Sequence, residues 1–166
     1  MNQVFESERI LFIEPTLELV PAYLVMVNDI ENVAKFIGER RTLLTEQEEI
    51  DYIKDKMDKD ATMFSMLEKD TREFISNIEF FNRVDDEAEW GIVITTKMQN
   101  KGYGKESLKR SVEYGFNELD LKRIYLEVYA NNPRAIHIYE NCGFKEYDRT
   151  DVDVFMEILK DECPDT

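Results

Sequence analysis

The sequence has few of the residues that build metal centres and disulfide frameworks. Its 166 residues include one histidine and two cysteines, and none of them follows the spacing of metal ligands. Cys142 belongs to an expected helix and Cys163 to a polar segment, so we expect two reduced thiols and no bridge. The single histidine, His137, is expected at the surface. The composition therefore argues against a bound metal.

A long apolar run is also missing. No stretch approaches the roughly 20 residues that a membrane-spanning helix requires, and residues 1–10 lack the basic and then apolar profile of a signal peptide. We therefore expect a cytoplasmic protein with no membrane partner. The length and a hydrophobic content of 43% fit one domain over residues 1–166, with a folded core at 1–160 and a polar tail at 161–166.

Positive charge is scarce. Lysine and arginine number 21 against 36 aspartates and glutamates, which gives a formal net charge of −15. This excess argues against nucleic acid as a partner, because phosphate backbones are bound by basic surfaces. It permits a cationic substrate, although an acidic surface also keeps many proteins soluble.

Basic residues nevertheless gather around one short, glycine-containing turn. Residues 97–110 carry five basic side chains against one acidic, and they include Gln-Asn-Lys-Gly-Tyr-Gly at 99–104. An apolar β-type run at 90–95 precedes the turn, and an amphipathic helix at 103–117 follows it. The backbone N–H groups of such a turn and of a helix start bind phosphate oxygens. The pattern predicts a pyrophosphate-binding loop.

Two other phosphate motifs fit this turn less well. A P-loop has four residues between its glycines and then Lys-Ser/Thr, whereas one residue separates Gly102 from Gly104 and Glu106 follows Lys105. A dinucleotide fingerprint requires a third glycine or alanine where Ser107 stands. The dinucleotide interpretation remains as the weaker alternative, beside a plain turn that joins a strand to a helix.

A second segment follows a strand expected at 123–129. Asn132 is suited to cap a helix, and Gly143 is suited to end it. Tyr139 lies two turns into this helix, on the same face as its apolar residues. The segment therefore presents a phenol on the inner face of a short helix.

Together the two segments resemble the GNAT superfamily of acetyl-CoA-dependent N-acetyltransferases. Residues 99–104 match that family's Gln/Arg-x-x-Gly-x-Gly/Ala loop, and residues 132–144 match its Asn-x-x-Ala-Ile-x-x-Tyr-x-x-x-Gly-Phe segment. The likeness is clear from 87 to 147. It implies an α+β fold with a mixed, mostly antiparallel central sheet of about seven strands flanked by helices, and a homodimer. It also implies that the loop strand and the next strand separate, with acetyl-pantetheine between them.

The rest of the chain fits this fold. Spacing and turn residues predict two N-terminal helices, the second with a capping box from Thr45 to Glu48, and a polar connection through Gly38 between them. The predicted helices are 17–27, 45–57, 103–117 and 132–142, and the predicted strands are 9–13, 61–67, 73–81, 87–95, 123–129, 144–149 and 152–159.

The resemblance assigns acetyl-CoA, the implied co-substrate, to three parts of the chain. Backbone groups of the loop strand would pair with the pantetheine amides, the loop and the helix start would hold the pyrophosphate, and the start of the second helix would add further contacts. These residues are Ile92, Val93, Ile94, Gln99, Asn100, Lys101, Gly102, Tyr103, Gly104, Lys105, Asn132 and Arg134.

Three residues are candidates for the chemistry. The resemblance places Tyr139 near the CoA sulfur, where it would act as the acid towards the departing thiolate. Glu127 and Glu89 are alternative bases on neighbouring strands, and the sequence leaves open which one acts, or whether both are ordinary strand carboxylates. An acyl-carrying Cys142 is disfavoured, because no basic neighbour is expected to lower its pKa.

We therefore expect an acyltransferase that moves an acetyl group from acetyl-CoA directly to a primary amine. The acceptor is either a protein N-terminus or a small polyamine, and residues 114–116 and 135–139 resemble spermidine acetyltransferases. The alternative is a non-catalytic, CoA-binding regulatory domain. Ile75-Ser76-Asn77 replaces the Ile-Gly that many members have on the third strand, so the substrate floor is expected to differ in shape.

Overall fold

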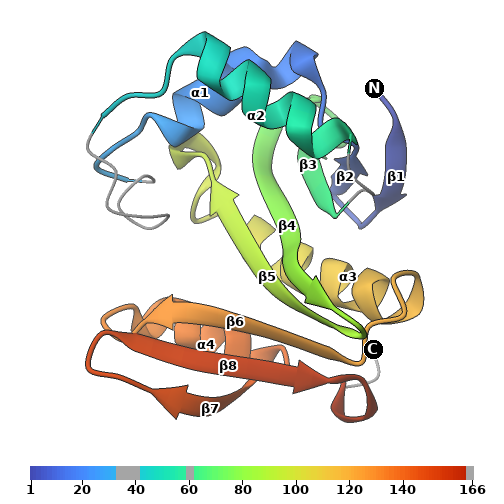
Figure 1. Cartoon of the computed structure of the whole chain (residues 1–166), viewed down its shortest axis with the longest axis vertical. Coiled ribbons are helices and arrows are strands. Elements are labelled where there is room, and N and C mark those ends of the chain that lie inside the picture. The colour runs from blue at the N-terminus through green and yellow to red at the C-terminus, as the bar shows by residue number, and fades with distance from the viewer. Residues whose placement is uncertain (33–41, 59–61, 164–166) are drawn as a thin grey trace. The chain divides into compact units, whose positions relative to one another are not determined.

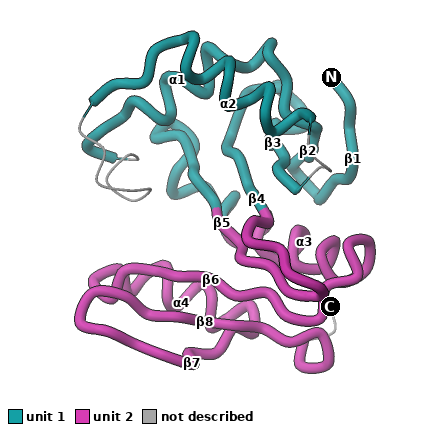
Figure 2. The backbone as a smooth tube through the Cα atoms, viewed as in Figure 1, with its two compact units in different colours: residues 1–79, 92–104 teal, residues 80–91, 105–166 magenta. Residues whose placement is uncertain are grey.

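The structure, a computed structural model, describes residues 1–32, 42–58 and 62–163. The predicted connection through Gly38, the first residue of the strand predicted at 61–67 and the end of the predicted tail lie outside these residues. The chain forms two compact units (Figure 2). The first unit consists of residues 1–79 and 92–104, and the second consists of residues 80–91 and 105–166.

The described residues form eight strands and four α-helices, with short 3-10 turns between them (Figure 1). In chain order they are β1 (Gln3–Glu6), β2 (Ile10–Ile13), η1 (Leu17–Leu19), α1 (Val20–Val27), α2 (Glu46–Asp58), β3 (Met63–Glu68), β4 (Phe74–Val84), β5 (Glu87–Ile94), η3 (Thr96–Met98), α3 (Tyr103–Asn117), β6 (Arg123–Tyr129), α4 (Pro133–Asn141), β7 (Lys145–Arg149), β8 (Asp153–Leu159) and η4 (Lys160–Glu162). The hydrogen-bonded strand order is β1-β2-β3-β4-β5-β6-β8-β7.

The sheet is mixed, as predicted. β5 and β6 run parallel, whereas β1–β2, β2–β3, β3–β4, β6–β8 and β7–β8 are antiparallel pairs. A parallel pair requires a crossover connection, and α3 supplies it between β5 and β6. The α+β class that the family resemblance implied is therefore confirmed.

The prediction of about seven strands misses β1. This segment has only four residues, two of them polar, so no alternation of apolar and polar residues stands out in the sequence. It becomes a strand through its partner: Phe5 pairs with Phe12 of β2, and the two rings stack with centroids 4.2 Å apart. Pairing with β2, rather than local strand propensity, therefore explains why these residues form a strand.

In the first unit, α1 and α2 contribute apolar side chains to a common core. The capping box at the start of α2 is formed as predicted: the Glu48 N–H donates to Thr45 Oγ1 at 3.1 Å, and the Thr45 N–H donates to Glu48 Oε2 at 3.4 Å. The core cluster contains Val20, Tyr23, Ile53 and Met63.

In the second unit, the strands bury one face against α3 and α4. Residues alternate along β6 and β8, so that one face carries the buried residues Ile124, Leu126, Val128, Val154, Met156 and Ile158. α3 approaches this face closely, because a Cβ added at Gly115 would lie 3.0 Å from the Phe80 ring and 3.1 Å from Ile124. The opposite face carries charged and aromatic side chains.

The predicted starts and ends of α3 and α4 are confirmed. α3 spans Tyr103–Asn117, as expected. Asn132 caps α4, since its Oδ1 accepts from the Ala135 N–H at 3.2 Å, and Gly143 follows the helix with a φ of +102°. Local capping chemistry therefore sets both ends of α4.

No helix in the described part of the chain is both long enough and apolar enough to cross a membrane. Within the same residues, no group of three or more His, Cys, Asp or Glu side chains is placed to hold a metal ion. Cys142 is buried and Cys163 is partly exposed, and no disulfide joins them.

Candidate active site

The glycine turn joins β5 to α3 by way of η3. Two of its residues, Asn100 with a φ of +63° and Gly102 with a φ of +86°, adopt left-handed backbone conformations. Alternation between right- and left-handed residues turns successive N–H groups toward one point, an arrangement that binds anions. The N-terminus of α3 follows at once and adds the positive end of its dipole. The turn therefore has the geometry of the predicted pyrophosphate loop.

Side chains of the first unit fix the loop and the strand that precedes it. Gln99 Nε2 donates to the Ile94 carbonyl at 3.0 Å, which ties the start of the loop back to the end of β5. The hydroxyl of Ser76 donates to the Val93 carbonyl at 2.5 Å. Two carbonyls of the strand predicted to pair with pantetheine thus already accept a side-chain hydrogen bond. Gln99 serves in this structure to position the loop.

Sequence reasoning did not select Arg9, yet this residue contacts the loop at several points. Its Nη1 donates to the Lys101 carbonyl at 2.9 Å, and its guanidinium carbon lies 4.5 Å from the centroid of the Tyr103 ring. A Cβ built on Gly102 would lie 3.1 Å from Arg9 Nη2. No local pattern could have revealed these contacts, because Arg9 precedes the loop by about ninety residues.

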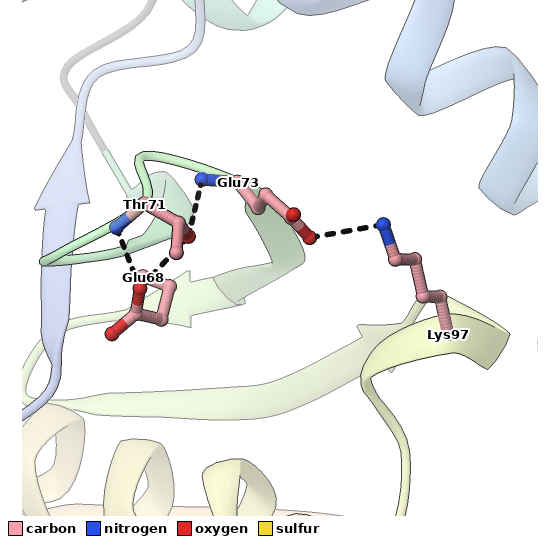
Figure 3. A network of polar contacts seen from close by, with 4 residues as sticks. All are labelled: Glu68, Thr71, Glu73 and Lys97. Atoms are coloured by element: carbon pink, nitrogen blue, oxygen red, sulfur yellow. Dashed lines mark hydrogen bonds and ion pairs between the residues drawn. The ribbon is translucent and has the colours of Figure 1, made fainter.

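The basic patch predicted from residues 97–110 is smaller than the sequence count implies. Lys97 Nζ lies 3.1 Å from Glu73 Oε2 (Figure 3), and Arg110 Nη1 lies 3.7 Å from Glu113. Glu73 and Glu113 both lie outside residues 97–110, so the charge count for that segment does not include them. Among the described residues, Lys101, Lys105 and Lys109 form no ion pair, and they remain the cations available to an anionic ligand.

Glu73 is itself held in place by the turn between β3 and β4. Its N–H donates to Thr71 Oγ1 at 3.2 Å, while the Thr71 N–H and hydroxyl both donate to Glu68 Oε2 at 2.8 Å (Figure 3). The hydrogen bond from the Thr71 N–H has the largest effect in lowering the pKa of Glu68, and the bond from the Thr71 hydroxyl lowers it further. The turn thus presents Glu73 in a fixed place for Lys97.

Tyr139, on α4 in the second unit, is a partly buried tyrosine. Its ring centroid lies 6.2 Å from Trp90 and 6.1 Å from Phe144. Burial raises the pKa of Tyr139 to about 12, so the hydroxyl stays protonated at neutral pH. Within the described residues this hydroxyl forms no hydrogen bond, and no buried side-chain oxygen there lacks a partner, so the hydroxyl oxygen is not fully buried.

Trp90 connects Tyr139 to the rest of the second unit. Its Nε1 donates to Ser111 Oγ of α3 at 2.9 Å, and the Ser111 hydroxyl donates in turn to the Leu108 carbonyl at 3.3 Å. The indole is therefore held at its polar end while its ring packs against Tyr139. The sequence predicts a strand at Trp90 but carries no local signal for this supporting contact.

The two candidate bases lie on one face of the second unit's strands, opposite the face that α3 covers. Glu89 pairs with Tyr125 across β5 and β6, and Glu127 is two residues further along β6, so both side chains emerge on the same side. Glu89 Oε1 accepts from Asn82 Nδ2 at 3.2 Å. The structure therefore brings the two carboxylates together.

Asp153 of β8 joins this pair, and sequence reasoning missed it. The β6–β8 register places it opposite Tyr129, diagonal to Glu127 and on the same face of the strands. Partial desolvation raises the pKa of Glu127, and the nearby charges of Asp153 and Glu89 raise it further. The signal was not local, since strand register brings these residues together.

The ladder between β5 and β6 is short. Within the described residues, its paired positions are Glu87–Glu89 on β5 and Arg123–Tyr125 on β6, although β6 continues to Tyr129. Glu127 thus lies beyond the last paired residue of its strand. This agrees with the separation of the two strands that the family resemblance implies.

The prediction that Cys142 has no basic neighbour is wrong in detail. Lys109 and Lys105 of α3 both act to lower the pKa of Cys142. Burial outweighs them, so the pKa of the thiol is raised. A raised pKa keeps the thiol protonated, which argues against a nucleophilic role.

The remaining predicted contacts lie at the start of α4. The Asn132 side chain accepts from Ala135, as described above, and Arg134 and His137 are exposed. Asn132, Arg134, Tyr139, Glu127, Glu89 and Lys105 belong to the second unit, whereas Ile92, Val93, Ile94, Gln99, Asn100, Lys101, Gly102, Tyr103 and Gly104 belong to the first.

The chain belongs to the acetyltransferase (GNAT) domain family, whose sequence profile matches residues 9–145. The matched range contains the glycine loop, both candidate bases and Tyr139. The family identified from the two sequence segments is therefore confirmed.

Curated relatives include the spermidine N(1)-acetyltransferase of Vibrio cholerae, which is 42% identical over 65 residues. That match covers 39% of this chain and 38% of the relative, so it spans well under half of either protein. The "Uncharacterized N-acetyltransferase YnaD" of Bacillus subtilis is 28% identical over 115 residues, 69% of this chain and 66% of the relative.

Solved structures share the fold over nearly the whole chain. A GNAT-family acetyltransferase from Bacillus anthracis has a TM-score of 0.83 at 23% identity and covers 95% of this chain and 98% of its own. The spermidine N-acetyltransferase of Vibrio cholerae in complex with CoA and spermine has a TM-score of 0.82 at 23% identity. The match covers 94% of this chain and 98% of that chain. At this level of identity, the likeness shows the fold.

Proposed function

We propose that this chain transfers the acetyl group of acetyl-CoA to a primary amine of a polyamine. The observation that carries the proposal is the loop at 99–104, which has the backbone geometry of an anion site at the start of a helix in a chain of the GNAT family. Its two left-handed residues, Asn100 and Gly102, alternate with ordinary ones directly before the start of α3, and this alternation supports an anion site.

The residues present fit acetyl-CoA. The loop N–H groups and the cations Lys101 and Lys105 suit the pyrophosphate, which is doubly anionic. Asn132 and Arg134 at the start of α4 add polar groups for the cofactor, and the backbone of residues 92–94 offers peptide groups for the pantetheine amides. Each of these contacts is part of the proposal.

The chemistry requires a neutral amine and a leaving sulfur that receives a hydrogen bond or a proton. Glu127, coupled to Asp153 and beside Glu89, has a raised pKa that suits it to accept a proton from the amine. Tyr139 stays protonated and has no partner among the described residues, so its hydroxyl can donate to the departing thiolate. The carbonyl carbon gains the amine nitrogen and loses the sulfur, and no covalent enzyme intermediate is needed.

A polyamine is the acceptor that the charges favour. Three carboxylates, Glu89, Glu127 and Asp153, share one face, and the chain carries a net charge of −15. Curated relatives named spermidine N(1)-acetyltransferase support the same substrate class. Acetylation of a protein N-terminus competes with this proposal, as does a non-catalytic, CoA-binding domain. The cytoplasmic location and the homodimer expected from the sequence stay predictions.

A thiol-release assay with acetyl-CoA tests the proposal. The acceptors would be spermidine, spermine, amino-acid amides, aminoglycosides and peptides with free N-termini, and mass spectrometry would identify the acetylated products. We expect CoA release above background with the polyamines. Release with peptides alone would instead identify the N-terminal activity. Binding of acetyl-CoA without release for any acceptor would leave a regulatory domain.

A further inference from the structure

We propose that Arg9 is a positioning residue for the acetyl-CoA loop, and that its guanidinium holds residues 99–104 in the conformation that receives the pyrophosphate. The inference rests on the proposed cofactor site. It assigns a role to a side chain far from the loop in sequence, at the edge of the first unit's N-terminal strands.

The hydrogen bond from Arg9 to the loop fixes one peptide group. Arg9 Nη1 donates to the Lys101 carbonyl at 2.9 Å. That carbonyl and the N–H of Gly102 belong to the same planar, trans peptide group, so they point in opposite directions. By holding the oxygen, Arg9 directs the Gly102 N–H to the other side, where the alternating backbone gathers its donors.

The stacking contact fixes the guanidinium itself. Its carbon lies 4.5 Å from the centroid of the Tyr103 ring, and Tyr103 is buried as the first residue of α3. A guanidinium over an aromatic face gains cation–π attraction and keeps its planar donors in one orientation. Arg9 therefore contacts the residues on both sides of Gly102, and it connects the loop to the helix start.

The glycine between those contacts leaves room for the side chain. A Cβ at Gly102 would lie 3.1 Å from Arg9 Nη2, closer than most real contacts of that kind. The positive φ of Gly102 already favours glycine. Gly102 thus allows both the backbone conformation of the loop and the close approach of Arg9.

The backbone of Arg9 is anchored independently of its side chain. Its carbonyl accepts from the Lys69 N–H at 2.8 Å, where β2 meets the turn after β3. A substitution at position 9 keeps this bond, so it removes the loop contacts without removing the strand. The positive charge of Arg9 also makes a small contribution to the lowered pKa of Glu68. Attraction between these two surface charges is the alternative role for the Arg9 side chain.

The test compares Arg9→Gln and Arg9→Lys with Arg83→Gln, which makes the same change at an exposed arginine of β4. Calorimetry would measure acetyl-CoA affinity, and hydrogen exchange without cofactor would measure protection of the loop amides. We expect Arg9→Gln to weaken binding about tenfold and to speed exchange at residues 99–104, because it removes a charge-assisted bond. Arg9→Lys keeps the charge but loses the planar fork, so an intermediate effect is expected.

The possible outcomes separate the role of Arg9 from the proposed function. Unchanged affinity in a folded Arg9→Gln variant would overturn the role, as would equal losses in Arg9→Gln and Arg83→Gln. Weaker binding with unchanged loop exchange would replace positioning by a direct phosphate contact. An unaltered chain that binds acetyl-CoA but acetylates no amine would contradict the proposed function while the Arg9 comparison still stands, whereas a chain that binds no acetyl-CoA would overturn both.

Discussion

At the scale of single residues, Tyr139 combines a ring that packs near Trp90 and Phe144 with a hydroxyl that has no hydrogen bond among the described residues. Tyr139→Phe keeps the packing against Trp90 and Phe144 and removes the donor. We expect kcat to fall about 10²-fold, with little change in acetyl-CoA affinity, because general-acid loss acts on the transition state. Steady-state kinetics and calorimetry measure the two effects.

The matched control for this change is Tyr52→Phe, on a half-exposed tyrosine of α2 that has no assigned role. It removes a phenol hydroxyl in the same way and should leave kcat unchanged. A near-normal kcat for Tyr139→Phe would assign the acid role to water or to another group.

Asp153 offers a test of the base through pH. Its negative charge contributes to the raised pKa of Glu127, whose ionised form accepts the proton. Activity through Glu127 is therefore lost as pH falls through that raised pKa. Asp153→Asn removes the negative charge and lets Glu127 ionise at lower pH, so the acid limb of the kcat profile should move to lower pH.

The pH dependence should be measured for kcat, because kcat/KM also changes with pH as the free amine substrate ionises. Asp151→Asn in the β7–β8 turn is the control, because it makes the same charge change at an exposed residue. NMR titration of the Glu127 side-chain carboxyl measures the coupling directly. An unmoved acid limb together with a lowered Glu127 pKa would show that another group, such as Glu89, is the base.

At the scale of elements, the two glycines of the loop differ in what they require. Gly102 has a positive φ, whereas Gly104 lies inside α3, and a Cβ there would meet Ile94 Cδ1 at 3.4 Å. Gly102→Ala should cost about 1 kcal/mol or more in backbone strain and press on Arg9, weakening acetyl-CoA binding about tenfold. Gly104→Ala should bind nearly normally, and the larger Gly104→Val should bind less well.

Calorimetry on the three variants, with melting temperatures to show that each is folded, checks this order. Equal affinities for Gly102→Ala and the unaltered chain would contradict the assignment of the loop to pyrophosphate.

How well an element could be predicted depended on how local its determinants are. α3 begins at the glycine turn, and α4 begins after Asn132 and ends before Gly143, because turn and capping residues act within a few positions. β1 escaped prediction because stacking of Phe5 on Phe12 decides it. Arg9 and Asp153 escaped for the same reason: strand register or a side chain distant in sequence brings them to their partners.

At the scale of the whole molecule, the net charge of −15 leads to a prediction about substrates. If this charge helps to collect a polycation, kcat/KM for spermidine should fall as salt is added, since screening reduces the reach of surface charge to about 8 Å at physiological ionic strength. An arylamine that is neutral at the assay pH should show no such slope. Parallel salt curves for the two would mean that the acidity serves solubility alone, which would favour the protein N-terminus as acceptor.

Trp90 is the single tryptophan of the chain, and this gives the protein a built-in optical reporter. The indole is buried, its N–H is bound to Ser111, and its ring meets that of Tyr139 edge-on. Light at the red edge of the aromatic absorption band excites tryptophan without exciting the eight tyrosines. The emission therefore comes from one site, so any shift of α4 as substrates bind would be readable in solution without attaching a dye.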